Sequence, residues 1–391
     1  MGKQVLYISG KLFPVNSGDA IYSLGILDRL VGGDADFDVL SYRYERTDTE
    51  GEEYRRFAAR FRQIRLIPYT PTKWETGKKI LLYGDGTQLY LEDMIREVEQ
   101  LLSQNRYDVI ILDHLRMFFL YETIQKRIDR SRTRIVLIQH NIEHLNAREE
   151  IRYQPRARDR WKLRLISNGI KSLEKRAILA VDDIWVISPE DKALVQKMGK
   201  EEDKVRVVPP YFRYPRVKET EQIEQSTYNL LLLGSMEWYP NVIGAVWFIE
   251  NVFRELVRLD DRYRLYIVGH NPSPRLRQYQ SGQIEVTGAV PSVDDYIRLC
   301  DFLIVPNTLG GGAKIKILEG IMKGIPVLAT RESTVGYSAG IFDDDFCVNH
   351  PQTFVRNIIQ LNKDAAKKIA FVKRAREIIA DNQNLRDILG P

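Results

Sequence analysis

The sequence has few of the residues and segments that mark several common protein classes. It contains only two cysteines, Cys300 and Cys347, too few for a disulfide framework and without the spacing of a zinc site. No apolar run is long enough to span a bilayer. Residues 1–9 have the pattern of a strand and not of a signal peptide. We therefore expect a protein of the reducing cytoplasm that has no membrane-spanning segment.

What is present is typical of a large α/β protein. Hydrophobic residues make up 44% of the 391 residues and charged residues 28%, which is enough apolar material for substantial cores. The length favours two domains or more. Runs rich in β-branched and aliphatic residues alternate with helical patterns, which indicates a doubly wound parallel sheet. The expected strands are 5–9, 38–41, 63–67, 109–112, 135–138, 184–187, 205–208, 229–233, 264–268, 284–290, 302–306 and 325–329.

One stretch late in the chain is the most informative. Three consecutive glycines, 310–312, follow an apolar strand and mark a turn in which backbone can approach a ligand closely. A helix is expected next, because Ile315, Leu318 and Met322 repeat at helical spacing and would form its buried stripe. Gly324 can end this helix in a left-handed conformation.

A strand, a glycine loop, a helix and a second strand in this order form a unit that holds phosphates. The loop leaves amide N–H groups free at a helix N-terminus, where the helix dipole favours an anion. Lys314 and Lys316 add positive charge there, which is unfavourable to the helix unless an anion occupies the site. The alternative is a tight turn before an amphipathic helix on which Glu319 and Lys323 pair at the surface. Neither GxGxxG nor GxxxxGK[ST] is matched, so a plain dehydrogenase or P-loop NTPase is not supported.

The stretch resembles the donor-binding segment of retaining glycosyltransferases of the GT-B fold, in particular glycosyltransferase family 4. That family usually has two glutamates eight positions apart. Glu319 matches the second, which by this resemblance holds the ribose of the nucleotide sugar, whereas Gly311 stands in place of the first. One branch of the family has a GGG-x-[RK]-x-K-I-L-E motif that this sequence fits closely. The donor-binding residues implied in this motif are Gly311, Gly312, Ala313, Lys314, Lys316 and Glu319.

A second part of the resemblance follows the strand that ends at Gly234. The family commonly places an Arg just after this glycine and a Lys six positions further on, and both hold the diphosphate. Here these donor-side positions are Ser235 and Asn241, so the usual cationic clamp is missing. The resemblance therefore implies that the charge facing the diphosphate comes from Lys314 and Lys316 instead.

Other residues are expected at the carboxyl ends of the strands, where open α/β sheets bind ligands. His114 and His140 each come shortly after an apolar strand and should lie at this edge. By the resemblance, His140 reaches the transferred sugar, and His114 is the second choice. Glu143 is expected on the acceptor side. Gly18 lies in a loop that faces the donor in the family, and the family counterpart of the strand that contains Gly288 passes beside the nucleotide base.

Residues 151–176 are unusually basic, and their two acidic residues are Asp159 and Glu174. Tyr153 and Trp161 lie among the basic residues. A solvated helix face is the usual explanation of such a run. The functional alternative is peripheral contact with anionic lipid at the inner face of the membrane, since aromatic residues favour that interface. Nucleic acid is not expected, because no nucleic-acid-binding signature accompanies the charge.

We predict a GT-B architecture, in which two Rossmann-like domains face a cleft. An acceptor-side domain spans 1–215, a linker 216–226, a nucleotide-sugar-binding domain 227–370, and a C-terminal helix over 371–391 returns to the first domain. The expected reaction is transfer of a hexose from a nucleotide sugar to a glycan, lipid-linked or other acceptor with retention, as in polysaccharide biosynthesis. Lys314, Lys316 and the loop amides would stabilise the leaving diphosphate, and His140 would orient the sugar.

Two alternatives stay open at this point. A sugar-nucleotide epimerase would use the same fold without an acceptor. A catalytically silent scaffold or binding subunit is also consistent with the uncharged residues at Gly311, Ser235 and Asn241. The acidic run 343–345 could bind Mg or Mn, but it comes after the main strands, and we interpret it as an acidic loop. We expect no cofactor and no metal.

Overall fold

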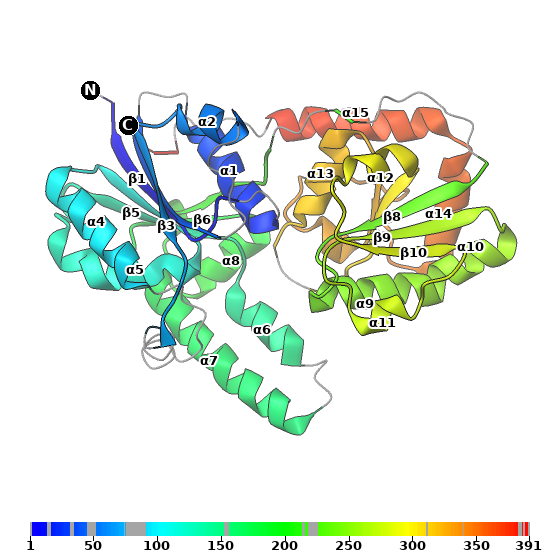
Figure 1. Cartoon of the computed structure of the whole chain (residues 1–391), viewed down its shortest axis with the longest axis horizontal. Helices are drawn as coiled ribbons and strands as arrows, with labels where there is room; N and C mark the ends of the chain where they lie inside the picture. Colours follow the sequence, from blue (N-terminus) through cyan, green and yellow to red (C-terminus); the bar gives the residue numbers. More distant parts are fainter. Residues whose placement is uncertain are drawn as a thin grey trace. The chain divides into compact units, whose positions relative to one another are not determined.

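The computed structural model describes residues 2–13, 17–31, 35–44, 52–73, 75, 91–151, 156–212, 216–217, 226–309, 312–338, 340–381, 385 and 388–389. The chain forms two compact units (Figure 1). The first consists of Met1–Pro210 together with Asn384–Pro391, and the second of Tyr211–Gln383.

The first unit is built on a seven-stranded sheet in which every described pairing is parallel, in the order β3-β2-β1-β4-β5-β6-β7. Its central strands are buried along almost their whole length, as in sheets covered by helices on both faces. The strands are β1 (Gln4–Ser9), β2 (Asp36–Arg43), β3 (Gln63–Pro68), β4 (Val109–Asp113), β5 (Arg134–Gln139), β6 (Asp183–Val186) and β7 (Val205–Val207). The helices are α1 (Gly18–Leu30), α2 (Glu52–Ala58), α4 (Glu92–Gln104), α5 (Phe118–Ile124), α6 (Glu143–Ile151), α7 (Ala157–Ala180) and α8 (Pro189–Lys197), with short 3-10 turns at Leu115–Met117, Gln125–Arg127 and Glu202–Lys204.

The register of the first sheet brings its polar strand ends to one edge. Ser9 pairs with Ser41 on one side and with Asp113 on the other, and Asp113 pairs with Ile138. The loops after β1, β4 and β5 therefore leave the sheet at the same level. Helix α1 begins at this edge, where the hydroxyl of Ser17 caps it by accepting the Ala20 N–H at 3.5 Å.

The second unit has a five-stranded parallel sheet in the order β10-β9-β8-β11-β12. Apolar side chains from its strands and helices form a continuous buried core. The strands are β8 (Tyr228–Leu233), β9 (Tyr263–Val268), β10 (Ile284–Gly288), β11 (Phe302–Val305) and β12 (Val327–Ala329). The helices are α9 (Tyr239–Phe248), a π-helical turn (Ile249–Phe253), α10 (Arg254–Leu259), α11 (Pro274–Arg277), α12 (Asp294–Leu299), α13 (Ile315–Lys323), a 3-10 turn (Arg331–Thr334), α14 (Pro351–Asn362) and α15 (Ala365–Asp381).

These two sheets confirm the predicted fold class, an α/β protein with two Rossmann-like units. The helix predicted after the glycine loop is α13, and Gly324 ends it at φ +106° with its N–H bonded to the carbonyls of Gly320 and Ile321. The predicted cleft between the units stays a prediction.

The buried stripe predicted for α13 is confirmed at Leu318, whereas Met322 packs against the core only partly buried. The residues fully buried are Ile317, Leu318 and Ile321, whereas the side chains expected at 315 and 322 are only partly buried. The reason is Gly320, where an added Cβ would lie 2.6 Å from a methyl carbon of Leu303 on β11. The helix packs closest to the sheet at this glycine, so the residues around it turn inward.

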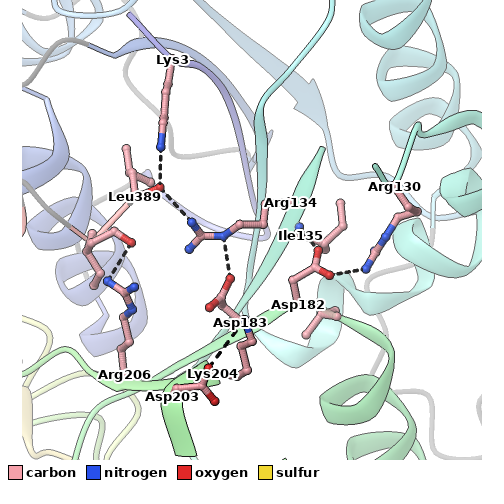
Figure 2. Close-up of polar contacts among 12 residues, drawn as sticks. Lys3, Arg130, Arg134, Ile135, Asp182, Asp183, Asp203, Lys204, Arg206 and Leu389 are labelled. Atoms are coloured by element: carbon pink, nitrogen blue, oxygen red, sulfur yellow. Dashed lines mark hydrogen bonds and ion pairs between the residues drawn. The ribbon is translucent and has the colours of Figure 1, made fainter. Parts of the chain in front are cut away.

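The C-terminal residues of the chain lie in the first unit. Lys3 Nζ and Arg134 Nη1 each donate to the carbonyl of Leu389 at 3.0 Å, and Arg206 Nη1 donates to the carbonyl of Ile388 at 3.2 Å (Figure 2). Helix α15, which contains the first part of the predicted returning helix 371–391, belongs to the second unit. The residues from Asn384 onward belong to the first unit. Of the predicted linker, residues 218–225 lie outside the described residues.

Candidate functional site

A polar cluster lies where β8 and β11 end in the second unit. It consists of Gly234, Asn241, Asn307 and Lys316, and we name it the lysine–asparagine cluster. Lys316 Nζ donates to Asn241 Oδ1 at 2.7 Å and lies 3.5 Å from Asn307 Oδ1. Asn307 Nδ2 also donates to Asn241 Oδ1, at 3.0 Å, and Asn241 Nδ2 donates to the carbonyl of Ser235 at 2.9 Å.

Position 234 requires a glycine because the side chains of this cluster lie very close to its backbone. Its φ is +143°, and a Cβ built on it would lie 2.8 Å from Asn241 Nδ2 and 3.2 Å from Lys316 Nζ. A side chain here would displace the ammonium or the amide, in a backbone conformation that favours glycine. The structure therefore brings together the predicted residues Gly234, Ser235, Asn241 and Lys316.

The Lys316 ammonium is held by neutral groups. Burial, and secondly the charge of Lys314, lower its pKa to about 7. Among the described residues, no carboxylate forms an ion pair with Lys316. A partly buried ammonium that is bonded only to amides is stabilised by an arriving anion. This environment suits a phosphate.

Lys314 is placed differently. It is the N-cap residue of α13 and 5% exposed, and its ammonium donates to the carbonyl of Gly312 at 3.1 Å. The Tyr337 hydroxyl donates to the Lys314 carbonyl at 2.9 Å and accepts the Leu318 N–H at 3.1 Å, which fixes the first turn of the helix. Lys314 thus braces the glycine loop, in which Gly312 has φ +69°. Ala313 is partly buried, and Gly311 lies outside the described residues.

The contacts described for Glu319 and Gly288 are with residues outside the lysine–asparagine cluster. The Glu319 carboxylate forms an ion pair with Lys323 at 2.8 Å, and Lys323 also pairs with Asp294 at 2.8 Å. The Glu319–Lys323 pair is the i, i+4 surface pair expected if the stretch is only a turn before an amphipathic helix, and Asp294 joins it through Lys323. Gly288 ends β10 at φ +76° after a register shift, and its carbonyl accepts the Gly269 N–H. The ribose and base roles given to these two residues stay predictions.

A second polar cluster lies at the carboxyl edge of the first sheet, and we name it the histidine cluster. Nε2 of His140 lies 2.6 Å from Asp113 Oδ1, and its Nδ1 lies 3.8 Å from Oδ1 of Asp19. The ring of His114 is 4.8 Å from that of His140, and its Nε2 lies 3.3 Å from Glu143 Oε1. The structure thus gathers the predicted His114, His140 and Glu143, with Asp19 next to the predicted Gly18.

His140 is a cation at neutral pH. Its burial alone would lower the pKa, but the Asp113 carboxylate and then Asp19 outweigh that effect and raise the pKa to about 10. Burial opposes the charge of Asp113 too, and His140 nevertheless lowers the pKa of that carboxyl. An imidazolium has a proton on both ring nitrogens and can only donate. His140 is therefore suited to orient hydroxyl groups and not to act as a base.

His114 adopts a strained backbone conformation. Its φ is +88°, which is rare outside glycine and costs of order 1–3 kcal/mol. Its N–H donates to the carbonyl of Ile138 at 3.0 Å, and its Nδ1 accepts the Arg116 N–H at 3.2 Å. These bonds turn the imidazole toward His140 and Glu143. Strain of this kind is concentrated at functional sites.

Three residues of these clusters had no predicted role in the site. Asp113 and Asn307 each follow an apolar strand directly, and the strand-end rule that pointed to the histidines could have found both. Asp19 follows the predicted Gly18 directly in the sequence. Asp19 lies near His140 because of how α1 packs, and no short-range sequence pattern predicts that packing.

The acidic run 343–345 pairs with basic residues of α15. Asp343 lies 2.8 Å from Arg374, and Asp345 pairs with Lys367. Within the described parts of the chain, no group of three or more His, Cys, Asp or Glu side chains is arranged to hold a metal ion. The expectation of a reaction without metal stays a prediction.

Comparisons with known proteins agree with this architecture. Residues 22–211 match the model of the family described as Glycosyltransferase Family 4, and residues 227–364 match the model described as Glycosyl transferases group 1. No curated protein matches the sequence.

Solved structures with low sequence identity share the fold. HepE from Anabaena, in complex with UDP and glucose, is 12% identical, with a TM-score of 0.62 over 99% of this chain and 98% of that one. TarM from S. aureus, in complex with UDP, is 9% identical, with a TM-score of 0.64 over 99% and 98%. A glycosyltransferase from Rickettsia africae is 14% identical, with a TM-score of 0.57 over 99% and 96%.

Two parallel-sheet units of this kind define the GT-B class of fold. The two family matches together span most of the chain, and the protein belongs to the GT-B glycosyltransferases, with a family 4 domain followed by a group 1 domain.

Proposed function

We propose that this chain transfers a hexose from a uridine diphosphate sugar to a hydroxyl acceptor, with retention and without a metal ion. The observation that carries the proposal is the Lys316 ammonium, held against the Gly234 loop by neutral amides close to the N-terminus of α13. HepE and TarM, which share the fold, have been solved with UDP, and this supports the choice of base.

The proposed chemistry depends on charge that is in place before the reaction. As the bond to the anomeric carbon breaks, the sugar becomes oxocarbenium-like and negative charge builds on the leaving diphosphate. Lys316 and the amides of the glycine loop would stabilise that charge without reorganising. The anion in turn raises the pKa of Lys316 and keeps it protonated. The Nδ1–H of His140 would donate a hydrogen bond to a sugar hydroxyl, since its Nε2–H is engaged by Asp113 and Asp19 lies 3.8 Å from Nδ1, and Glu319 would accept bonds from the ribose.

Isothermal titration with UDP, other nucleoside diphosphates and the free nucleosides tests the proposal. We expect UDP to bind more tightly than uridine, and incubation with UDP-sugars to give slow hydrolysis or transfer that EDTA does not abolish. Failure of every nucleotide to bind would contradict the proposal and favour a scaffold. Turnover of the donor into a free epimerised sugar without any acceptor would favour an epimerase.

We also propose that the acceptor is reached at an anionic membrane surface, through helix α7. Trp161 and Leu165 lie one turn apart on this helix and are 63% and 52% exposed. Among the side chains of the helix that the structure describes, the exposed basic ones are Arg158, Arg164, Lys171, Lys175 and Arg176, of which Arg176 pairs with Glu122. Its two acids do not balance them, because Glu174 is fully buried against His144 and Asp159 is partly buried. Arg152 and Tyr153 of the predicted basic segment lie outside the described residues. Among the described helices, none is both long and apolar enough to cross a bilayer.

Vesicle sedimentation tests the membrane proposal. The protein should bind vesicles that contain phosphatidylglycerol, lose binding at high salt, and bind about tenfold more weakly after Trp161→Ala with Leu165→Ala. Leu259, which is 52% exposed in the second unit, offers a matched control. Equal binding by the double variant and Leu259→Ala, or a preference for RNA over vesicles, would contradict the proposal.

A further inference from the structure

Asn307 lies at the centre of the lysine–asparagine cluster, although it belongs to neither the predicted motif nor the predicted clamp. It comes two residues after β11 and is 1% exposed. Its backbone carbonyl accepts hydrogen bonds from the hydroxyls of Thr330 and Ser333, the latter at 3.0 Å. The side chain therefore starts from a backbone that is fixed by a neighbouring segment.

The amide of Asn241 needs such a partner to keep its orientation. Its Oδ1 accepts from both Lys316 Nζ and Asn307 Nδ2, while its Nδ2 donates to Ser235. A flip of this amide would turn its NH₂ group toward the Lys316 ammonium. Lys316 Nζ and Asn307 Nδ2 would then lose the oxygen to which both donate, which is costly for buried groups. Asn307 opposes this flip because it presents a second donor to the same oxygen.

Asparagine is also the side chain that the charges require here. Alanine or serine could not span the distance with a donor. An aspartate would have nearly the same shape but would put a carboxylate where Asn307 Oδ1 now lies 3.5 Å from the ammonium. That carboxylate would neutralise Lys316 and repel a diphosphate. Lys314 is the one other charged group that affects Lys316 among the described residues, and it is a cation.

We propose that Asn307 is a positioning residue for the donor diphosphate. It orients the amide of Asn241 and so keeps the Lys316 ammonium at the Gly234 loop, where the phosphates would bind. This inference rests on the proposed function, since it assigns Asn307 to that same site.

The proposal is tested with Asn307→Ala, Asn241→Ala and the double variant, by titration of UDP and uridine at pH 6.5. We expect each single change to weaken UDP binding about tenfold, the lower end for a lost hydrogen bond to a charged group, and to leave uridine unchanged. Because Asn307 acts through Asn241, the double variant should bind UDP as Asn241→Ala does. Asn229→Ala, a buried asparagine at the other end of the same sheet, should affect stability alone.

Wild-type UDP affinity in Asn307→Ala, or fully additive losses in the double variant, would overturn the positioning role. A test without ligand separates this outcome from failure of the proposed function. In protein with ¹³C-labelled lysine, Asn307→Asp should raise the pKa of Lys316 by more than one unit, because a carboxylate now faces the ammonium. If the pKa of Lys316 does not change, the positioning role fails, whether or not UDP binds. If the pKa rises but no nucleotide binds the wild type, the proposed function fails instead.

Discussion

The two clusters differ in how each surrounds a buried or partly buried cation. In the first unit, His140 lies between two carboxylates, and its pKa is raised to about 10. In the second unit, Lys316 is bonded to two amides beside another lysine, and its pKa is lowered to about 7. Both lie at the carboxyl edge of a parallel sheet. The comparison teaches that the same place in the fold can hold a neutralised cation, suited to hydroxyl groups, or an uncompensated one, suited to an anion.

The largest effect is expected from Asp113→Asn, which removes the negative charge beside His140. Because breaking a buried ion pair costs about 3–5 kcal/mol, the free energy of unfolding should fall by that amount near pH 6. The pKa of His140 is raised from its ordinary 6.5 to about 10. The His140–Asp113 pair therefore contributes its full stabilisation of the folded state below pH 6.5, and this stabilisation is lost as the pH rises through about 10. Chemical denaturation from pH 6 to 10 should show the two proteins converging. A constant difference would contradict the pairing.

Lys316→Ala should lower turnover by about 100- to 1000-fold, the range for losing a group that stabilises developing charge. Lys314→Ala should cost less, because its ammonium braces the loop through Gly312. Single-turnover rates of both variants measure the difference. Equal losses would show that the two lysines act together, as the sequence alone suggested.

Much of the fold follows from the sequence, because alternating apolar runs and helical spacing depend on short-range patterns. The strands around Gly234 and the helix ended by Gly324 were predicted at nearly their observed bounds. The strand-end rule also led to His114 and His140, which the structure places in contact. Which amide supports Lys316 could not be predicted, since Asn241 and Asn307 are 66 residues apart and meet through the packing of α9 against the segment that follows β11. The full extent of the buried face of α13 was missed for a similar reason, the close approach at Gly320.

A smaller effect is expected at Glu319. Its carboxylate is predicted to bind the ribose, but in this structure it forms an ion pair with Lys323. If the ribose role holds, Glu319→Ala should cost about 1.5–3 kcal/mol of uridine and UDP binding. Lys323→Met should leave that binding nearly intact and reduce stability. Calorimetry on both variants is decisive, since equal donor affinity in wild type and Glu319→Ala would leave only the structural pair.

The smallest expected effect is that of metal removal. If Lys316 and the amides of the glycine loop supply the positive charge that a divalent ion supplies in other enzymes, as we propose, turnover in EDTA should stay within about twofold of the untreated rate. Complete loss that Mn restores would return Asp343 to Asp345 to consideration, despite their pairing with α15.

The central claim is that Lys316 is the uncompensated cation that meets the diphosphate, and proton uptake on UDP binding measures it most directly. At pH 8 the free protein should hold Lys316 largely neutral, since its pKa is about 7, and bound UDP should protonate it. Titrations in two buffers of different ionisation enthalpy should therefore show uptake of nearly one proton in the wild type and almost none in Lys316→Arg, which is protonated throughout. Identical enthalpies in both buffers for the wild type, or uptake that persists in Lys316→Arg, would contradict the account.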